Sequence, residues 1–352
     1  MNRRLLFITP GLGKGGAETQ LLKIAKHAQL EGDKVMILAL KPINNFSENL
    51  EDLGIEVVFL KDWTRSFLPN VTSLYKYLKE FRPHTVVAFM FIGIIIARML
   101  KLKFGFKLIS SVRNSAISKK WSTIFKLTSK LDDLVVFNAI ASQHNFENTK
   151  LITSRSIVIN NAVSIPSADM GELLNDSEFI WISIAHFRPS KDYHTLFEAV
   201  SLIKDKEFRI DILGNLNHQT WPQEKIKELQ IENRVRLLGF QQHPHLFLQK
   251  ADALVLSSFN EGMPNAILEA MSYSKPIVAS NIDGIRELLT DSKCGFLFEP
   301  GNPKELADRM LQMMAMSAGE MKFLGSKGRK KIEESFSERV VLDKWQEVIN
   351  EI

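Results

Sequence analysis

The chain has 352 residues, of which 45% are hydrophobic and 24% are charged. This balance is ordinary for a soluble globular protein and excludes a disordered or fibrous chain. Because one hydrophobic core rarely serves much more than about 150 residues, we expect two domains. The one cysteine, Cys294, excludes an internal disulfide framework and a CxxC metal or redox motif, which fits a reducing compartment such as the cytoplasm.

The apolar runs of the chain are short. Residues 5–8 are the only apolar run near the N-terminus, which is too short for a signal peptide. The longest apolar stretch, residues 86–96, falls well below the roughly 20 residues that span a bilayer. We therefore expect neither a signal peptide nor a membrane span.

Charge is divided unevenly along the chain, although its net value is only +5. Residues 1–165 contain 23 Lys and Arg against 12 Asp and Glu, a net charge of +11, whereas residues 166–352 contain 22 against 28, a net charge of −6. A basic half suggests an anionic partner, either phospholipid headgroups or a phosphate-bearing acceptor. We do not expect nucleic acid, since no helix-turn-helix, zinc-finger, RRM or KH pattern is present.

The first half alternates short apolar runs with helical periodicity, which predicts a doubly wound α/β domain over residues 1–165. Expected strands cover residues 4–9, 34–40, 56–60, 85–89, 107–112, 133–137 and 156–159. Expected helices include residues 18–31 and 71–80.

A polar stretch at residues 166–176 interrupts this rhythm, which then restarts and predicts a second Rossmann-like domain over residues 166–335. Expected strands cover residues 179–185, 209–214, 235–238, 253–257 and 276–279, and expected helices cover residues 195–203, 265–271 and 303–314, the last with Asn302 as its cap. A helix at residues 338–351, within a tail of residues 336–352, is expected to pack back on the N-terminal domain. Two such α/β domains leave a cleft between the carboxyl ends of their strands, where we expect the ligand to bind.

A glycine-rich turn follows the first expected strand. It reads Gly11-Leu12-Gly13-Lys14-Gly15-Gly16, so unhindered backbone N–H groups and a helix N-terminus face any anion there. The pattern also fits G-x-G-x-x-G, but a nicotinamide enzyme needs an acid after the second strand, where the chain has Ala39-Leu40-Lys41. The alternative is a tight turn with no ligand.

Two carboxylates stand eight positions apart in residues 258–271. Gly262 and Pro264 predict a turn, Asn265 is the expected cap of the next helix, and Glu269 lies about one helical turn in. Carboxylates such as Glu261 and Glu269 suit hydrogen bonds from vicinal hydroxyls of a sugar or ribose, and the helix N-terminus between them suits a phosphate.

At these residues the chain resembles glycosyltransferase family 4, whose members share the two-domain GT-B fold and carry an E-x7-E motif. The resemblance runs nearly end to end, with further family-like stretches at residues 15–18, 159–163, 238–240 and 251–253. It implies that Glu261 contacts the donor sugar, that Glu269 contacts the nucleotide ribose, and that the backbone at 262–264 meets the sugar and phosphates. The donor-binding residues expected in this way are Gly13, Gly15, Gly16, His186, Arg188, Lys191, Gly214, Gly239, Phe240, Glu261, Gly262, Met263, Pro264, Asn265 and Glu269.

The family also places an Arg and a Lys on the donor diphosphate in a G-R-L-x-x-x-K pattern. The corresponding loop reads Ala185-His186-Phe187-Arg188-Pro189-Ser190-Lys191, so Lys191 matches and His186 replaces the Arg. Either a protonated His186 or Arg188 must then supply the second positive charge. Lys191 is the expected stabiliser of the leaving diphosphate, because no Asp-x-Asp metal motif is present.

Two features of the N-terminal half have alternative interpretations. Arg113 follows a strand at a place where many family members carry a His facing the transferred sugar, so it is a candidate catalytic residue for donor sugar or acceptor phosphate. A helix-capping or surface role is the alternative. Residues 119–131 predict a basic helix with Trp121, Ile124, Phe125 and Thr128 on one face, either for a bilayer interface or for the domain's own sheet.

The expected function is metal-independent, retaining transfer of a sugar, with Glu261, Lys191 and Arg113 as catalytic residues. The donor is a nucleoside-diphosphate sugar, most consistent with a UDP-sugar, and no cofactor is expected. The acceptor is a glycan or lipid-linked glycan of surface polysaccharide biosynthesis, such as lipopolysaccharide or capsule, at the inner face of the cell membrane. Rival functions are a GT-B-fold sugar-nucleotide epimerase, a nicotinamide dehydrogenase and a non-catalytic sugar- or lipid-binding module.

Overall fold

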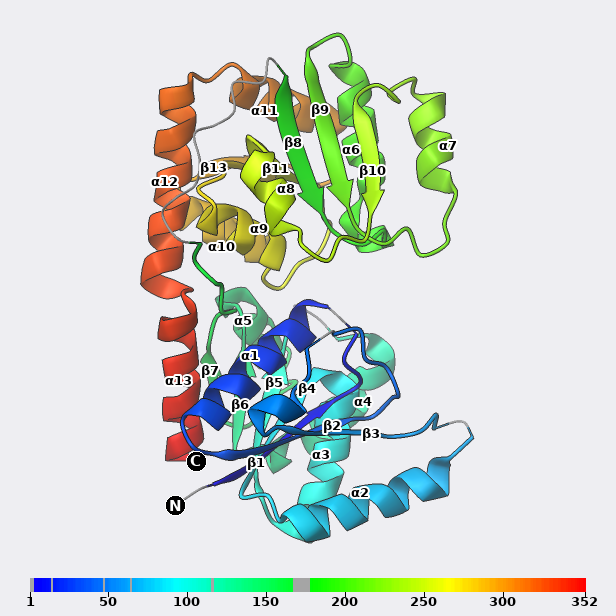
Figure 1. The fold of residues 1–352 in the computed structure, drawn as a ribbon, viewed down its shortest axis with the longest axis vertical. Helices are drawn as coiled ribbons and strands as arrows, with labels where there is room; N and C mark the ends of the chain where they lie inside the picture. The colour runs from blue at the N-terminus through cyan, green and yellow to red at the C-terminus, as the bar shows by residue number, and fades with distance from the viewer. Residues whose placement is uncertain (1–2, 14, 47, 64, 115–116, 167–177) are drawn as a thin grey trace. The chain divides into compact units, whose positions relative to one another are not determined.

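The computed structural model describes residues 3–13, 15–46, 48–63, 65–114, 117–166 and 178–352. Lys14 of the glycine-rich turn and nearly all of the polar stretch at 166–176 lie outside these residues. The chain divides into two compact units, one of Met1–Ala162 with Arg339–Ile352 and the other of Val163–Glu338. We call them unit 1 and unit 2 and describe each by itself (Figure 1).

Unit 1 is built on a seven-stranded parallel sheet in the order β3-β2-β1-β4-β5-β6-β7. Its strands are β1 Arg4–Thr9, β2 Lys34–Ala39, β3 Glu56–Phe59, β4 Thr85–Phe89, β5 Lys107–Val112, β6 Leu134–Phe137 and β7 Ser156–Val158. Its helices are α1 Gly16–Leu30, α2 Phe67–Phe81, α3 Met90–Phe104, α4 Lys119–Thr128, α5 Ile140–Asn148 and α13 Glu338–Glu351. Strands of this kind are buried on both faces, which explains their nearly continuous apolar sequences.

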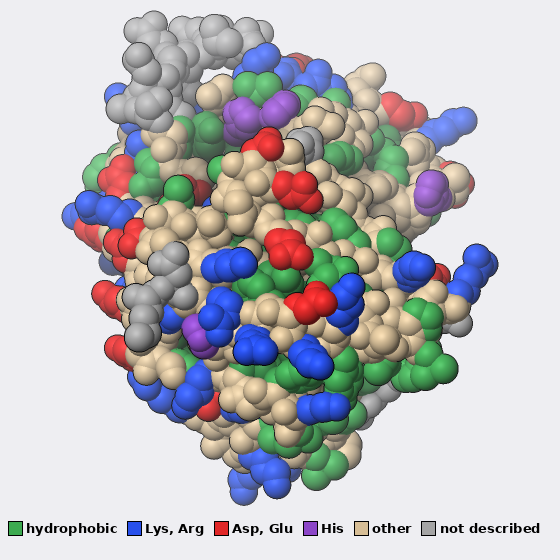
Figure 2. Space-filling view, turned by 60° about the horizontal axis from the view of Figure 1, so that its bottom comes forward, with side chains coloured by type: hydrophobic (Ala, Val, Ile, Leu, Met, Phe, Trp, Pro, Cys, Tyr) green, Lys and Arg blue, Asp and Glu red, His purple; other side chains and the backbone are tan. Residues whose placement is uncertain are grey.

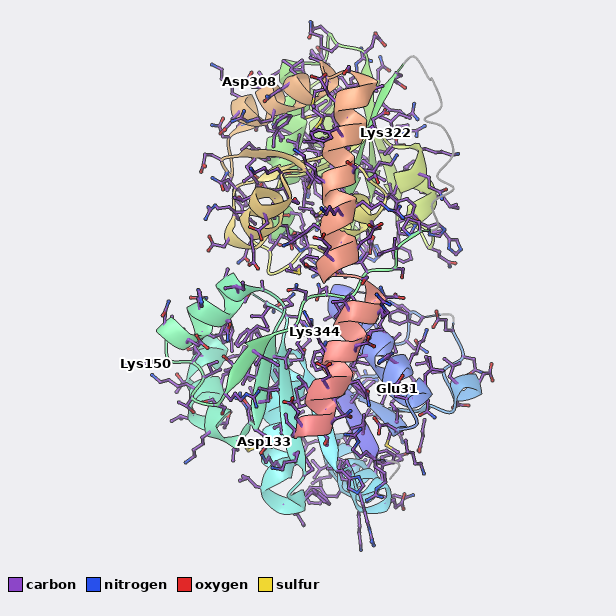
Figure 3. The ribbon with its side chains drawn as sticks, turned by 90° about the vertical axis from the view of Figure 1, so that its left-hand side faces the viewer. Glu31, Asp133, Lys150, Asp308, Lys322 and Lys344 are labelled. Atoms are coloured by element: carbon purple, nitrogen blue, oxygen red, sulfur yellow. The ribbon has the colours of Figure 1, made fainter. Side chains whose placement is uncertain are left out.

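Two hydrophobic cores lie on the two faces of this sheet. One face packs against α1 and against Val341, Leu342, Trp345 and Ile349 of α13. The other packs against the inner sides of α2, α3, α4 and α5. Figure 3 turns α13 toward the viewer, lying along unit 1 with Lys344 on its outer side. The end of the chain is therefore an integral layer of the unit that begins it.

Unit 2 is built on a six-stranded parallel sheet in the order β10-β9-β8-β11-β12-β13. Its strands are β8 Phe179–Ile184, β9 Phe208–Leu213, β10 Val235–Gly239, β11 Ala253–Leu256, β12 Ile277–Ser280 and β13 Gly295–Phe298. Its helices are α6 Tyr193–Leu202, α7 Trp221–Glu228, α8 His245–Lys250, α9 Asn265–Ser272, α10 Asp283–Ser292, α11 Pro303–Met314 and α12 Ala318–Ser335. In such a sheet, ligands bind at the carboxyl ends of the strands around the point where strand order reverses, here between β8 and β11.

The expected fold class is confirmed, since both units are doubly wound parallel sheets. Strands β1, β4 and β5 have the expected bounds, and Asn302 caps α11 by accepting from the Glu305 N–H at 3.1 Å. The apolar stretch at 86–96 holds two elements, because Met90 turns the chain with φ 62° between β4 and α3. The pattern did not reveal α3, since its residues around Ile94–Ile96 are apolar on every side.

The expected single face of α4 is wrong in one respect. Phe125 is buried in the hydrophobic core between the sheet and helices α2 to α5, whereas Ile124 is 40% exposed. Adjacent residues of a helix point about a quarter-turn apart, so both cannot serve the same face fully.

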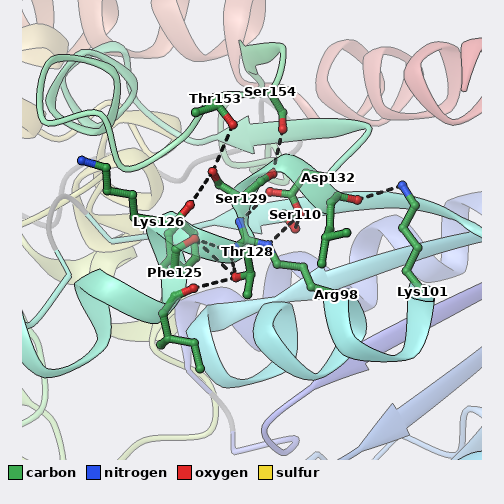
Figure 4. A network of polar contacts seen from close by, with 12 residues as sticks. Arg98, Lys101, Ser110, Phe125, Lys126, Thr128, Ser129, Asp132, Thr153 and Ser154 are labelled. Carbon is green, nitrogen blue, oxygen red and sulfur yellow. Dashed lines mark hydrogen bonds and ion pairs between the residues drawn. The ribbon is translucent and has the colours of Figure 1, made fainter. Parts of the chain in front are cut away.

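A buried ion pair joins three elements of unit 1 (Figure 4). Arg98 of α3 donates through Nε and Nη2 to the carboxylate of Asp132 at 2.9 and 2.5 Å, and both side chains are fully buried. The Arg98 Nη1 also donates to Phe125 O of α4 at 2.8 Å, and Ser110 of β5 donates to Asp132 at 2.7 Å. Nearly every polar atom of the pair has a partner, so it fixes α3 and α4 relative to β5.

We expect Asp132→Asn to lower the free energy of unfolding of unit 1 by about 3–5 kcal/mol, because it leaves a buried guanidinium without its counter-charge. The double variant Arg98→Met with Asp132→Leu should cost less than the single change, since it buries no unpaired charge. Urea unfolding of the full chain measures both. Asp343→Asn, at an exposed site on α13, is the control, and a loss for Asp132→Asn no larger than this control's would contradict the role of the pair.

Candidate functional site

Lys191 and Glu261 meet at the carboxyl edge of the unit 2 sheet. Lys191 ends the short turn Pro189–Lys191 after β8, and Glu261 lies in the loop between β11 and α9. Their side chains form an ion pair, and the Ser258 hydroxyl donates to the same Glu261 oxygen, Oε1, at 2.8 Å. The Glu261 side chain is only 12% exposed and that of Lys191 21%. Two residues seventy positions apart thus share one partly buried polar site.

Ser257 and the Phe259 backbone of the β11 loop hold these two loops together. The Ser257 hydroxyl donates to the backbone carbonyls of Lys191 and Asp192, at 3.1 and 2.8 Å, and the Phe259 N–H donates to Ser190 O at 2.8 Å. The Lys191 backbone is therefore held by the same loop that presents Glu261.

Gly284 at the start of α10 lets the Glu261–Gly262 backbone pass very close. A Cβ atom at Gly284 would lie 1.9 Å from Gly262 O and 2.8 Å from Glu261 O. Such a contact is impossible, so only glycine fits here. The loop is thereby set against the N-terminus of a second helix.

The cap expected at Asn265 is wrong. Helix α9 begins at Asn265 and its N-cap position is Pro264, whose side chain makes no capping hydrogen bond. Met263 and Pro264 are buried, and they bring the chain into the helix without a polar cap. Glu269 is half-buried and lies one turn into α9, the helix that directly follows the Glu261 loop.

His186 lies between two loops at the same edge of the sheet. Its Nδ1 accepts a hydrogen bond from the Asn215 backbone N–H at 3.0 Å, and its ring is 6.2 Å from that of Phe240 at an interplanar angle of 28°. Phe240 and Gly239 line an open pocket together with residues of the β9 loop, which are Asn215, Leu216, His218, Gln219 and Thr220. His186 therefore braces the wall of this pocket.

Acceptance at Nδ1 means that this nitrogen carries no proton. Burial, and then the positive charges of Arg188 and Lys191, lower the pKa of His186 below its ordinary 6.5. The ligand-free structure therefore favours a neutral His186, and Arg188, which is exposed, is the remaining candidate for the second positive charge. The neutral imidazole presents Nε2–H as a donor.

Gly214, at the end of β9, has a packing reason to be glycine. A Cβ there would lie 1.9 Å from Ala185 O, so the β8 and β9 loops can touch only if this residue has no side chain. Gly239 has φ 68°, a backbone conformation that favours glycine. The structure brings Lys191, Glu261 and His186 to one edge of unit 2 with Gly214, Gly239 and Phe240.

The glycine-rich turn and Arg113 belong to unit 1. Gly15 is the N-cap of α1 and Gly16 its first residue, so the turn does end at a helix N-terminus. The Leu12 N–H donates to Ile43 O at 2.9 Å, and Gly13 lies beside Ile43. The turn is therefore anchored to the loop after β2.

Arg113 is a buried cation, not the surface or capping residue that was the alternative. Its Nε donates to Ser111 Oγ at 2.8 Å and its Nη1 to Asn161 Oδ1 at 2.9 Å, while the guanidinium lies 5.3 Å from the Phe89 ring and 5.5 Å from the Trp345 ring. Among the hydrogen bonds described for it, none reaches Nη2. Burial lowers its pKa to about 9, so it stays charged at neutral pH.

The partners of Arg113 were not predicted from the sequence. Asn161 belongs to a family-like stretch, which was a usable signal, but Trp345 comes from the tail helix and nothing local connects it with residue 113. Within the described part of the chain, no group of three His, Cys, Asp or Glu side chains could hold a metal ion. None of the helices there is long and apolar enough to cross a membrane.

We expect the imidazole of His186 in the ligand-free protein to titrate below pH 6.5, so that the Asn215–His186 bond is fully present above that pH and is lost as the pH falls through the lowered pKa. Arg188→Ala should raise this pKa, because it removes a neighbouring positive charge. An NMR titration of the ring measures both changes, with Arg309→Ala, on α11, as the control. A wild-type pKa above 6.5, or no response to Arg188→Ala, would contradict the neutral assignment.

Comparisons with known proteins find glycosyltransferases. Residues 167–331 match the family model described as glycosyl transferases group 1. The chain is 28% identical over 243 residues to the poly(ribitol-phosphate) alpha-N-acetylglucosaminyltransferase of Staphylococcus aureus, covering 67% of this chain and 47% of that protein. It is 26% identical over 244 residues to the lipopolysaccharide 1,6-galactosyltransferase of Escherichia coli, covering 66% of each. The first curated relatives are matched over between 42% and 63% of their length.

The fold is also that of solved structures. The Anabaena protein Alr3699/HepE, solved in complex with UDP and glucose, matches with a TM-score of 0.84 over 100% of both chains at 21% sequence identity. This likeness extends through unit 1, which the family model does not reach. Residues 167–331 therefore match the group 1 glycosyl transferases, as the resemblance to glycosyltransferase family 4 implies, and the whole chain has the GT-B fold.

Proposed function

We propose that this protein is a retaining glycosyltransferase that moves a hexose from a UDP-sugar to a hydroxyl of a glycan or lipid-linked glycan acceptor. The match of residues 167–331 to the group 1 glycosyl transferases supports the class of reaction. The complex of Alr3699/HepE with UDP and glucose supports the donor. The names of the relatives, which include a poly(ribitol-phosphate) alpha-N-acetylglucosaminyltransferase and a lipopolysaccharide 1,6-galactosyltransferase, support a place in surface polysaccharide biosynthesis.

The observation that carries this proposal is the Lys191–Glu261 pair. It joins a cation suited to a diphosphate with a carboxylate suited to sugar hydroxyls, at the edge of a parallel sheet where ligands bind. The surrounding serine and glycine contacts lie outside the hydrophobic core. They hold polar groups at a partly open edge of the sheet. A binding module would not need a cation fixed beside the sugar-binding carboxylate.

The donor-binding residues take separate roles in this proposal. Glu261 accepts hydrogen bonds from sugar hydroxyls, and Glu269 accepts them from the ribose. The Gly262–Asn265 backbone and the N-terminus of α9 meet the phosphates. Lys191 and Arg188 supply positive charge to the diphosphate, and His186 donates from Nε2–H. Gly214, Gly239 and Phe240 border the nucleotide, and Gly13, Gly15 and Gly16 of unit 1 contribute backbone N–H groups.

The chemistry requires no protein nucleophile. The bond from the sugar anomeric carbon to the diphosphate oxygen breaks, and the acceptor oxygen forms its bond on the same face. The acceptor proton passes to the departing phosphate oxygen, and UDP leaves. Positioning, together with stabilisation of the charge that develops on the diphosphate, lowers the barrier. Lys191 and Arg188 perform that stabilisation, so we propose that the reaction needs no metal ion.

The acceptor is assigned to unit 1 on grounds of charge. Residues 1–165 carry a net charge of +11, and Arg113 is a cation at the carboxyl edge of β5 with no carboxylate among the hydrogen-bond partners described for it. We propose that Arg113 contacts a phosphate of the acceptor or the transferred sugar. We further propose that the protein is cytoplasmic and peripheral on the inner face of the cell membrane, where lipid-linked acceptors are found.

We expect Lys191→Ala to lower kcat for UDP-sugar turnover by about a hundredfold to a thousandfold, because a preorganised charge at the leaving group is lost. Glu269→Ala should chiefly raise the KM for the donor. UDP release from a panel of UDP-sugars, with and without lipid-linked acceptors, measures both. Lys250→Ala, exposed on α8, is the matched control. Turnover that survived both active-site changes would refute the assignment of the site.

We expect Arg113→Met to reduce transfer to the acceptor while UDP binding, measured by calorimetry, stays within a factor of a few of wild type. The reason is that Arg113 belongs to unit 1, whereas the residues proposed to hold the UDP part of the donor lie mostly in unit 2. Arg113→Lys keeps the charge and should restore part of the rate. Equal losses for Met and Lys, with unchanged acceptor KM, would indicate a packing role only.

A further inference from the structure

Helices α2, α3 and α4 lie side by side on one face of the unit 1 sheet. Tyr75 of α2 and Phe104 of α3 have ring centroids 5.5 Å apart, and the Lys103 Nζ lies 4.4 Å from the Tyr75 ring. Arg98 of α3 donates to Phe125 O and Thr128 Oγ1 of α4. The inner sides of all three helices are used by the core. Their outer sides therefore form one surface, which we call the α2–α4 face.

Large apolar side chains project from the α2–α4 face. Phe67 and Leu68 of α2 are 63% and 73% exposed, Leu102 of α3 is 68% exposed and Leu127 of α4 is 69% exposed. Less exposed members of the same set are Ile92, Met99 and Ile124. Single exposed apolar residues are normal on a protein surface, but three adjacent helices that each present them are not.

The charge on this face is almost entirely positive. Lys76, Lys79, Lys103, Lys126 and Lys130 are exposed on these helices or just after them. The sequences of the three helices contain a single acidic residue, Glu80. Figure 2 shows lysine and arginine side chains interspersed with hydrophobic ones over the lower part of the surface that it turns forward, the end of unit 1 that carries α2.

We propose that the α2–α4 face docks unit 1 on the surface of a bilayer that contains anionic phospholipids. The apolar side chains enter the boundary between headgroups and acyl chains, and the lysines contact the headgroup phosphates. A protein partner fits this face less well, because lysine is depleted at protein–protein interfaces. The long lysine side chains instead suit a bilayer interface, where their apolar stems stay buried and their ammonium groups reach the headgroups.

This inference rests on the proposed function in one respect, since docking matters most if the acceptor is linked to a lipid. It goes beyond that function by naming the face. Unit 1 contains both the docking helices and Arg113. The unit proposed to bind the bilayer therefore also contains the residue assigned to the acceptor.

The test is sedimentation of the full chain with vesicles of phosphatidylglycerol and phosphatidylcholine in equal parts, and with vesicles of phosphatidylcholine alone. We expect binding to the anionic vesicles only. Raising the ionic strength from about 0.1 M to about 1 M shortens the screening length from about 10 Å to about 3 Å and should weaken binding without abolishing it. Equal binding to both kinds of vesicle, or binding that salt leaves unchanged, would overturn the proposal.

Matched variants locate the face. Leu102→Ser and Leu127→Ser should each weaken binding by about tenfold, because each removes an apolar side chain from the interface. Leu30→Ser is the control, since Leu30 is 81% exposed on α1 at the opposite face of the same sheet. Lys126→Glu should weaken binding by at least about fivefold, whereas Lys344→Glu, on the outer side of α13 (Figure 3), should not. Controls that weakened binding as much as the face variants would overturn the assignment of this face.

UDP binding by calorimetry, measured on every variant, separates the two proposals. It reports folding of the chain and the proposed nucleotide site, and none of these substitutions touches unit 2. Vesicle binding without UDP binding would count against the proposed function and leave the docking face standing. UDP binding without vesicle binding would overturn the docking face and leave the proposed function standing.

Discussion

The ion pair between Lys191 and Glu261 depends on a close approach of backbone loops that is possible only where two positions are glycine. The loops after β8, β9 and β11 converge at one edge of a parallel sheet, because the carboxyl ends of parallel strands all lie at the same edge. Gly214 lets the β8 and β9 loops touch, and Gly284 lets the β11 loop pass against the start of α10, at distances that any Cβ would prevent. The Ser257 hydroxyl then fixes the Lys191–Asp192 backbone to the Glu261 loop. The electrostatics of the site thus follow from sterics at two glycines.

Much of the fold could be predicted because buried parallel strands leave a strong signal. Each strand is a short run of apolar residues between polar turns, and the expected strands match those of both sheets closely except for β13. That strand, Gly295–Phe298, was not predicted. Helix α3 was missed because its apolar residues surround it and hide the helical period. Periodicity reports a helix only when one side faces water.

The candidate site was predictable where a residue acts through its own chemistry, and not where it acts through a distant partner. The spacing of Glu261 and Glu269 and the match of Lys191 are local properties of the sequence. The state of His186 depends on the Asn215 N–H, which comes from the next strand's loop. The setting of Arg113 depends on Asn161 and on Trp345 of the tail helix. Such contacts belong to the tertiary fold, so no local pattern contains them.

The pairing of Lys191 with Glu261 also bears on how the proposed donor would be distinguished from its product. In the structure each of these charges neutralises the other. A UDP-sugar can replace both partners at once, because its hydroxyls satisfy Glu261 while its diphosphate satisfies Lys191. UDP alone satisfies only Lys191 and would leave a carboxylate that is 12% exposed with the Ser258 hydroxyl as its remaining described partner. An unpaired, partly buried charge is costly, so under the proposed function the intact donor would gain an interaction at this pair that UDP lacks, and re-formation of the ion pair would favour the release of UDP.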